Sequence, residues 1–241
     1  MNPDQIKINL EVVRDRIAGA CRRSGRKETD VTLVGVTKYV EPELIRAATE
    51  AGLMHLGESY LQEARRKQEL MPGPIVWHFI GHLQRKKTRE AVERFRFIHS
   101  LDRKDLAEEI NRRAGETGRK AQILIEVNLA GEESKSGISE ESLPGLVDFS
   151  RSLPHLSLIG LMTIPPPGPA PESSRPYFRR LRALREKLAG PDLPLPELSM
   201  GMSLDLEVAV EEGATLLRIG TAIFGPRRVA SESCSKGERS K

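Results

Sequence analysis

The sequence predicts an α/β fold in which a single domain closes into a (β/α)8 TIM-like barrel. Segments with strand and helix patterns alternate along almost the whole chain, and about eight such units in 241 residues fit one barrel. The strands are nearly continuous apolar runs, which is typical of parallel sheets covered on both faces. An open doubly wound sheet is the alternative, but its glycine-rich dinucleotide fingerprint does not follow the first strand.

The amino-terminal half begins with an amphipathic helix. Apolar residues recur every three or four positions from Ile6 to Cys21, and Gly25 is a natural end for this helix. The segments expected next are strands at 31–38, 54–59, 75–82 and 96–102, and helices at 41–52, 60–70, 83–95 and 103–118.

The carboxy-terminal half repeats this rhythm. The proline-rich stretch 164–176 cannot continue a helix or a strand, so we expect a loop or lid there. The polar segment 229–241 is expected to be a disordered tail, which leaves one domain at 1–228. The other segments expected are strands at 121–128, 156–164, 195–203 and 215–225, and helices at 139–153, 176–190 and 203–213.

Composition favours a globular protein of the cytoplasm. Charged residues make up 30% of the chain, no apolar run approaches the roughly 20 residues of a membrane span, and no secretory signal is visible. Cys21 and Cys234 form no CxxC pair, which is consistent with a reducing compartment. The formal charge of +4 favours an anionic ligand, either a phosphorylated small molecule or a nucleic acid.

Lys38 ends the first strand, VTLVGVTKYV, with an ammonium group. The carboxyl ends of the strands hold the active site of barrel enzymes, and a desolvated amine there would be a good nucleophile toward a carbonyl. The alternative is a lysine that reaches solvent from a strand end. His78 and His82 are four residues apart, but their segment is a strand with a turn at Gly81 rather than a helix, so we expect no metal site from their spacing.

Two further motifs predict an anion site. In SMGMSLD, Met200 and Ser203 lie where a strand turns into a helix, and free N–H groups at a helix start favour an anion. An ordinary helix capped by Ser203 is the alternative. In LLRIGTAIFG, Arg218 interrupts an apolar strand just before Gly220 and Thr221, and it needs either a ligand or an inward-facing acidic partner.

The barrel brings these motifs together. SMGMS and RIGT become the loops after the seventh and eighth strands, which is the recurrent phosphate site of such barrels, and Lys38 is their neighbour around the ring. A lysine beside a phosphate site suits a phosphorylated aldehyde, and pyridoxal 5'-phosphate (PLP) is the obvious candidate cofactor.

The chain resembles the pyridoxal-phosphate homeostasis protein family, of the YggS or PROSC type. This family is similar to the N-terminal barrel of alanine racemase. The resemblance runs from about residue 31 to 225 and rests on VGVTKYV, HLGESYLQE, WHFIGHLQRKK, IHSLDR, VNLAGEESKSGI, GLMTIPP and SMGMSLDLEVAVEEGATLLRIGTAIFG.

The resemblance implies a role for each candidate residue. Lys38 would form the internal aldimine with PLP, and Arg218 would lie beside the pyridine nitrogen. Ser203, Gly220 and Thr221 would hold the phosphate, with Met200 in the same loop. Ser59 is also counted with the cofactor site, although the family usually has asparagine there, and serine lacks the paired donor and acceptor of an amide.

The function expected is therefore a PLP-binding protein that buffers PLP and delivers it to apo-enzymes. We expect a protein that is not an enzyme, because no proton carrier opposite the lysine is evident among Tyr39, Tyr60 and Tyr177. We also expect the protein to be a monomer. A PLP-dependent racemase or lyase is the alternative. A nucleic-acid binder is a further alternative, but aromatic residues are only 4% of the chain and provide no stacking platform.

Overall fold

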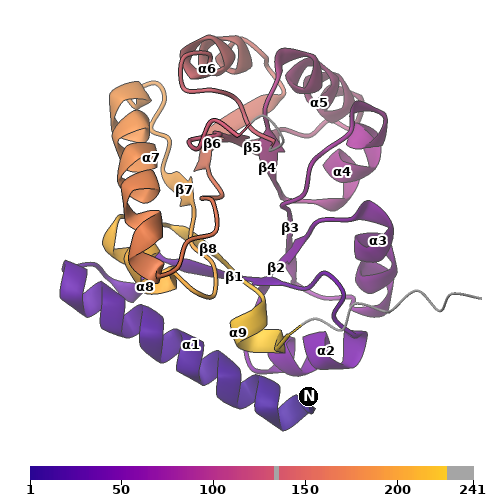
Figure 1. Cartoon of the computed structure of the whole chain (residues 1–241). Helices are drawn as coiled ribbons and strands as arrows, with labels where there is room; N and C mark the ends of the chain where they lie inside the picture. The colour runs from indigo at the N-terminus through magenta and orange to yellow at the C-terminus, as the bar shows by residue number, and fades with distance from the viewer. Residues whose placement is uncertain (133–135, 227–241) are drawn as a thin grey trace, which may run out of the picture.

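The computed structural model describes residues 1–132 and 136–226 and confirms the predicted barrel. Within this part, eight parallel strands pair in sequence order, and β1 pairs with β8 to close the ring (Figure 1). The strands are β1 (Thr32–Val36), β2 (His55–Glu58), β3 (Val76–Phe79), β4 (Phe97–Leu101), β5 (Ala121–Glu126), β6 (Leu156–Met162), β7 (Glu197–Ser199) and β8 (Leu216–Ile219).

Helices surround the ring of strands, as Figure 1 shows. They are α1 (Pro3–Ser24), α2 (Pro42–Glu50), α3 (Leu61–Leu70), α4 (Thr88–Arg94), α5 (Lys104–Glu116), α6 (Leu143–Arg151), α7 (Arg175–Leu188), α8 (Leu206–Glu211) and α9 (Thr221–Phe224), with short 3-10 turns η1 (Glu28–Asp30), η2 (Arg85–Lys87) and η3 (Pro171–Ser174). No helix in the described part of the chain is both long enough and apolar enough to cross a membrane.

The first helix forms as its pattern predicts. The Asn2 side chain accepts a hydrogen bond from the backbone of Gln5, and Gly25 ends the helix in a left-handed conformation, with φ 67°. The predicted apolar face from Ile6 to Cys21 is buried. It packs α1 across α8, α9 and α2, outside the ring (Figure 1).

Alternation along the strands divides the molecule into two apolar clusters. Most buried apolar residues lie between the strands and the surrounding helices. A small second cluster contains Val34, Leu124, Met162 and Leu216, from four strands around the ring. Residues two apart on a strand share a face. This alternation places Lys38 on the inward side together with Val34, and Arg218 on the inward side together with Leu216.

The predicted strand at 215–225 is wrong in its second part. The strand ends at Ile219, and residues 221–224 form α9, whose first bonds run from Ile223 and Phe224 to the carbonyl of Gly220. Ile223 and Phe224 are buried, and α9 packs on α1. A short apolar run can be buried in a helical turn as well as in a strand, so its pattern alone did not distinguish them.

Three other helices begin several residues later than expected. The segment 83–95 divides into η2 and α4, α6 begins at Leu143 rather than at 139, and α8 begins at Leu206 after Asp205, not at Ser203. Asp205 accepts the backbone N–H of Met202 through Oδ1 at 2.7 Å and the hydroxyl of Ser174 through Oδ2 at 2.7 Å. The proline-rich segment is thereby tied to the loop after β7. The predicted tail at 229–241 lies outside the described residues.

Candidate functional site

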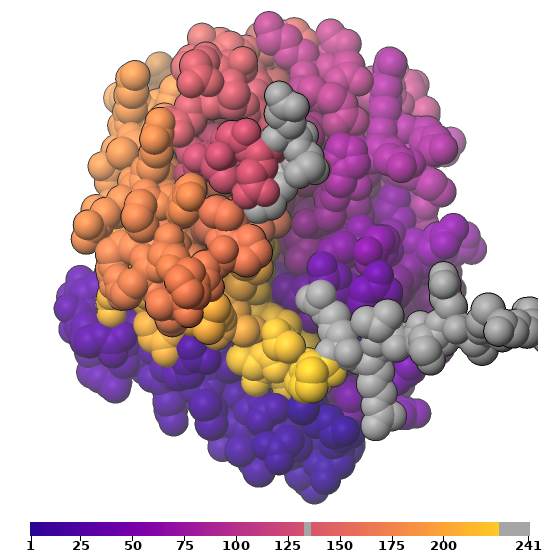
Figure 2. Space-filling view, in the orientation of Figure 1, coloured from indigo at the N-terminus to yellow at the C-terminus, as the bar shows by residue number. Residues whose placement is uncertain are grey.

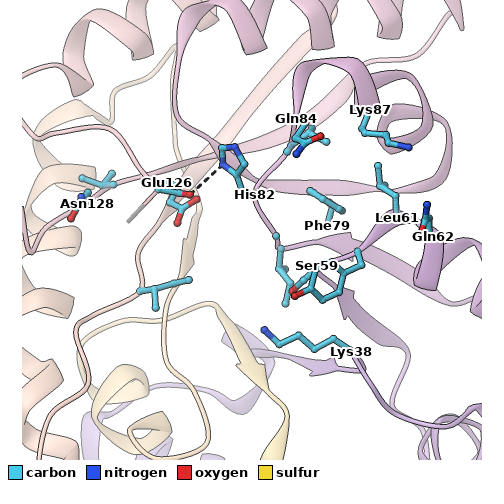
Figure 3. Close-up of a pocket in the computed structure, with 17 residues that line it drawn as sticks. Lys38, Ser59, Leu61, Gln62, Phe79, His82, Gln84, Lys87, Glu126 and Asn128 are labelled. Atoms are coloured by element: carbon cyan, nitrogen blue, oxygen red, sulfur yellow. Dashed lines mark hydrogen bonds between the residues drawn. The ribbon is translucent and has the colours of Figure 1, made fainter. Parts of the chain in front are cut away.

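Lys38 lines a cavity at the carboxyl rim, meaning the face formed by the carboxyl ends of the strands and the loops that follow them. Lys38 is half-buried in the turn after β1, and its amine extends into a cavity of about 690 Å³ (Figure 3). The space-filling view shows this face hollowed near its centre (Figure 2). Lys38 therefore lies at the carboxyl end of the first strand and beside a cavity of ligand size, while its bond to a cofactor stays a prediction.

The turn that carries Lys38 is held in a strained conformation. Tyr39 has φ 62°, a left-handed value that residues other than glycine adopt rarely. Its backbone N–H donates to Oε1 of Glu63 at 2.6 Å, and the N–H of Val40 donates to the carbonyl of Thr37 at 3.0 Å. These bonds fix the direction in which the Lys38 side chain leaves the backbone.

A buried ion cluster anchors this turn from outside the barrel. Nζ of Lys67 lies 2.7 Å from Oε1 of Glu58 and 2.7 Å from Oε1 of Glu63, and it also donates to the carbonyl of Thr37. Thr37 donates its hydroxyl to Glu58 at 2.6 Å. Burial raises the pKa of Glu58 even though Lys67 acts against this. The cluster connects α3 and β2 to the residue before Lys38.

Ser59 reaches the cavity because Gly81 lets two strand ends approach each other. A Cβ at Gly81 would lie 2.3 Å from the carbonyl oxygen of Ser59, so only glycine fits. Ser59 lines the same cavity as Lys38 (Figure 3). Tyr60 also lines it, with its hydroxyl 3.0 Å from that of Tyr39. The sequence analysis identified no proton carrier opposite the lysine among the tyrosines, and the structure places Tyr60 at the cavity that Lys38 lines.

Glu126, at the end of β5, lines the cavity as well. It is 7% exposed, and burial raises its pKa to about 7, with Asp102 adding to the rise and Arg218 opposing it. A carboxyl group with such a pKa can give or take a proton near neutral pH. The sequence analysis did not single out Glu126; alternation from Leu124, which shares its face of β5, could have found it.

Ser203, Gly220 and Thr221 meet where the loop after β7 contacts the start of α9. The hydroxyl of Ser203 accepts the backbone N–H of Ala222 at 3.1 Å and lies 3.5 Å from that of Thr221. Ser203 therefore caps α9 rather than α8. These residues do not line the cavity of Lys38, but β1 pairs with β8 through Gly35 and Ile219, so both groups belong to one section of the rim.

Arg218 is buried on the inward face of β8. Its guanidinium donates to the hydroxyl of Ser199 at 2.6 Å and to the carbonyl of Thr163 at 2.9 Å. Burial lowers its pKa to about 10, so it stays a cation at neutral pH. In the described residues, neutral oxygen atoms accept its bonds rather than the acidic partner considered above. The charges of Glu126 and Asp205 act on it without an ion pair.

Met200 is completely buried in the main apolar cluster. It supports the loop after β7 from beneath and presents no exposed atom. Its predicted contact with the cofactor is therefore the one that this geometry supports least.

Three inward-facing histidines, His55, His78 and His99, were not grouped by the sequence analysis, which considered only His78 among them, as a metal ligand. They lie on β2, β3 and β4 and hydrogen-bond to one another inside the barrel. Each stands at an inward position of its strand, but without the barrel's register their proximity could not be read from the sequence. Among the residues that the structure describes, no group of His, Cys, Asp and Glu could hold a metal ion.

Comparisons with known proteins agree with this geometry. A family model described as alanine racemase, N-terminal domain, matches residues 2–228. An alanine racemase of Clostridium difficile has the same fold at a TM-score of 0.75, with 15% identity, covering 95% of this chain and 58% of that one. The fold and the lysine at its rim define the class, that of alanine racemase-like barrels.

More similar proteins narrow the class. A pyridoxal phosphate homeostasis protein from Aquifex aeolicus is 48% identical over 221 residues, covering 91% of this chain and 97% of that protein. One from Pseudomonas aeruginosa is 44% identical over 223 residues, covering 92% and 96%. The structure of PipY from Synechococcus elongatus with PLP bound has a TM-score of 0.79 and 37% identity, covering 88% of this chain and all of that one. The chain belongs to the pyridoxal phosphate homeostasis protein family.

Proposed function

We propose that this protein binds PLP covalently through Lys38 and takes part in PLP homeostasis by holding and releasing the cofactor. The observation that carries the proposal is the Lys38 amine in a cavity on the section of the rim where β1 meets β8. The names of the curated relatives and the PLP-bound structure of PipY support it.

The residues at this section of the rim fit PLP chemically. PLP supplies an aldehyde that reacts with an amine, together with a phosphate and a pyridine nitrogen. Lys38 offers the amine. The hydroxyls of Ser203 and Thr221 and the start of α9 after Gly220 offer donors for the phosphate. Ser59 lines the space beside Lys38, where it replaces the family's usual asparagine.

Arg218 favours a carrier over a transaminase. A guanidinium that remains charged disfavours a proton on a neighbouring pyridine nitrogen, and an unprotonated ring withdraws electrons less. Because Ser199 and Thr163 hold Arg218 in place, this electrostatic influence is a fixed property of the site.

Replacing Lys38 tests the proposal. In Lys38→Ala we expect no visible absorbance from bound PLP and no label after borohydride reduction, because the amine is gone. Lys7→Ala, an exposed position on α1, is the matched control and should label as the unchanged protein does. Mass spectrometry of the reduced protein locates the label. A label that persists in Lys38→Ala would contradict the proposal.

A PLP-dependent racemase or lyase is the second candidate, favoured by one observation. Glu126 and Tyr60 line the same cavity as Lys38 and could each carry a proton. Exchange of the α-proton of single L-amino acids in D2O, followed by NMR, distinguishes the two functions. A carrier should give exchange no faster than free PLP does, whereas turnover that Glu126→Gln abolishes would establish the enzyme.

We further propose that the protein delivers PLP to apo-enzymes, that it is a monomer and that it acts in the cytoplasm. The buried free thiol of Cys21 suits a reducing compartment. Sedimentation should give a mass near 26.8 kDa. PLP transfer should activate a purified apo-enzyme faster than free PLP released into solution can.

A further inference from the structure

A continuous chain of hydrogen bonds crosses the inside of the barrel and ends at Arg218. Its four donor–acceptor distances are 3.0 Å between Nδ1 of His55 and Nε2 of His78, 2.9 Å between Nδ1 of His78 and Nε2 of His99, 2.9 Å between Nδ1 of His99 and Oγ of Ser199, and 2.6 Å between Oγ of Ser199 and Nη1 of Arg218. Only His55 is more than slightly exposed. Five strands therefore contribute to one polar chain.

The three imidazoles are neutral. Burial lowers the pKa of His78 to about 3 and that of His99 well below its usual range, and it also lowers the pKa of His55. A neutral imidazole has one N–H donor and one acceptor nitrogen. Each ring in the chain must therefore donate on one side and accept on the other, so all the bonds point the same way along the chain.

Arg218 determines which way they point. A guanidinium can only donate, so Oγ of Ser199 accepts from it. Among the described residues, Nδ1 of His99 is the other partner recorded for this oxygen, and it receives the hydroxyl hydrogen. His99 then donates from Nε2 to His78, and His78 donates from Nε2 to His55. Each of the three rings is the Nε2–H tautomer.

The opposite direction is disfavoured at both ends. It would leave the hydroxyl hydrogen of Ser199 buried without an acceptor. At the other end, the negative charge of Glu197 acts on His55. Near this anion, a His55 ring with a hydrogen on Nε2 is more favourable than a ring whose Nε2 is unprotonated.

We propose that His55, His78 and His99 are positioning residues, which as three aligned Nε2–H tautomers fix the Ser199 hydroxyl and thereby hold the Arg218 guanidinium at the rim. The tautomers follow from the hydrogen-bond geometry of buried, neutral rings and do not depend on the cofactor. The consequence for the cofactor rests on the proposed function, in which Arg218 lies beside the PLP ring. The chain of hydrogen bonds would then connect His55, at the start of β2, to the electrostatics of the bound cofactor.

The tautomers are tested by ¹⁵N NMR of the histidine rings at pH 7, without PLP. We expect the two-bond correlation pattern of the Nε2–H form for His55, His78 and His99. His82 and His155 are exposed and serve as references, and single His→Asn variants assign the signals. A charged ring or an Nδ1–H form at any of the three would overturn the proposal.

The positioning role is tested on the PLP-loaded protein with two replacements of His99. His99→Leu removes the acceptor for Ser199, whereas the amide oxygen of His99→Asn lies close to the place of Nδ1. We expect His99→Leu to shift the visible absorbance of bound PLP and to release PLP about tenfold faster, and His99→Asn to restore both within about twofold. An unchanged absorbance and release rate in folded His99→Leu would refute the role.

Ser199 provides the same comparison if His99→Leu does not fold. Ser199→Ala removes the hydroxyl between His99 and Arg218, and Ser199→Thr keeps it. The effect on PLP release should appear in the alanine variant and be absent in the threonine variant, and equal release rates would refute the role. If the unchanged protein binds no PLP at Lys38, the proposed function fails, while the NMR experiment still tests the tautomers.

Discussion

At the scale of single residues, burial gives Glu126, at the carboxyl rim, a pKa near neutral pH. It lines the same cavity as Lys38, yet its pKa is raised to about 7, mainly by desolvation. The buried histidines are shifted in the opposite direction for the same reason, because burial disfavours whichever form carries charge. The cavity therefore has a carboxyl group that exchanges its proton in the physiological range.

The raised pKa of Glu126 predicts a specific dependence of stability on pH. The folded protein holds this proton to higher pH than the unfolded chain, whose pKa is near 4.5. The stabilisation is complete below about pH 4.5 and is lost as the pH rises through about 7, by about 3 kcal/mol in total. Urea unfolding, measured at about ten pH values between 4 and 8, should show this loss when the unchanged protein is compared with Glu126→Gln.

The difference in the free energy of unfolding between the unchanged protein and Glu126→Gln isolates the effect of Glu126. It is needed because the lowered pKa values of the histidines make both proteins less stable as the pH falls. Glu108→Gln, at an exposed position on α5, should follow the unchanged protein. Parallel curves for the unchanged protein and Glu126→Gln would show that folding does not shift the pKa of Glu126.

At this scale, the residues that the sequence revealed are those that interrupt an apolar strand. Lys38 and Arg218 stand out because valine, leucine and isoleucine surround them. His55 and His99 did not, and His78 was considered only for its spacing from His82, because a histidine in a short strand is unremarkable until the strand's neighbours are known. Only the register of β2, β3 and β4 turns three separate residues into one chain.

At the scale of elements, α1 supports both loops that are proposed to hold the phosphate. Arg16 forms a two-pronged ion pair with Glu207, at 2.6 and 2.8 Å, and donates to the carbonyl of Ser203 at 3.2 Å. Asn9 donates to the carbonyl of Ile223 at 2.9 Å, in α9. A helix that precedes the first strand therefore contacts the loops after the last two strands.

Arg16→Ala should loosen the loop after β7. We expect about 1 kcal/mol of destabilisation, because the ion pair is partly exposed, and PLP release about threefold faster. Arg22→Ala, at an exposed position on the same helix, is the control. Release can be followed by the absorbance change after dilution into excess apo-enzyme. Equal release rates for the two variants would show that α1 does not influence the site.

The extent of the elements was predictable where a pattern was long and where the ends carried signals. The face from Ile6 to Cys21 and the cap at Gly25 define α1 well. The end of β8 was not predictable, because its apolar residues Leu216, Leu217 and Ile219 are followed, after Gly220, by the apolar turn of α9. The helix-starting role given to Ser203 belongs to Asp205, since either residue suits a helix start and only the packed loop decides.

For the whole molecule, closure of the ring depends on close backbone contacts. Gly160 of β6 pairs with Glu197 of β7, and a Cβ at Gly160 would lie 1.9 Å from the carbonyl oxygen of Glu197. The two nearest atoms are backbone atoms of Glu197, which cannot move aside as the end of a flexible side chain could. The β6–β7 junction, where the shortest strand joins the ring, therefore requires glycine.

Gly160→Ala should lower the free energy of unfolding by about 3 kcal/mol, because the two strands must separate. Gly145→Ala is the matched control: Gly145 is exposed in α6 and has no atom within 4 Å of its added Cβ. There the change should stabilise the protein by about 0.5–1 kcal/mol. Urea denaturation measures both, and a neutral Gly160→Ala would show that the strands separate without cost.

Pairing of β1 with β8 has a consequence during synthesis on the ribosome. Lys38 emerges long before Arg218, Gly220 and Thr221, so a nascent chain carries the amine well before it carries the other residues that are proposed to bind PLP. If the proposed site is right, PLP binds only after the final strand has been translated, and we expect a product truncated before β8 to remain colourless.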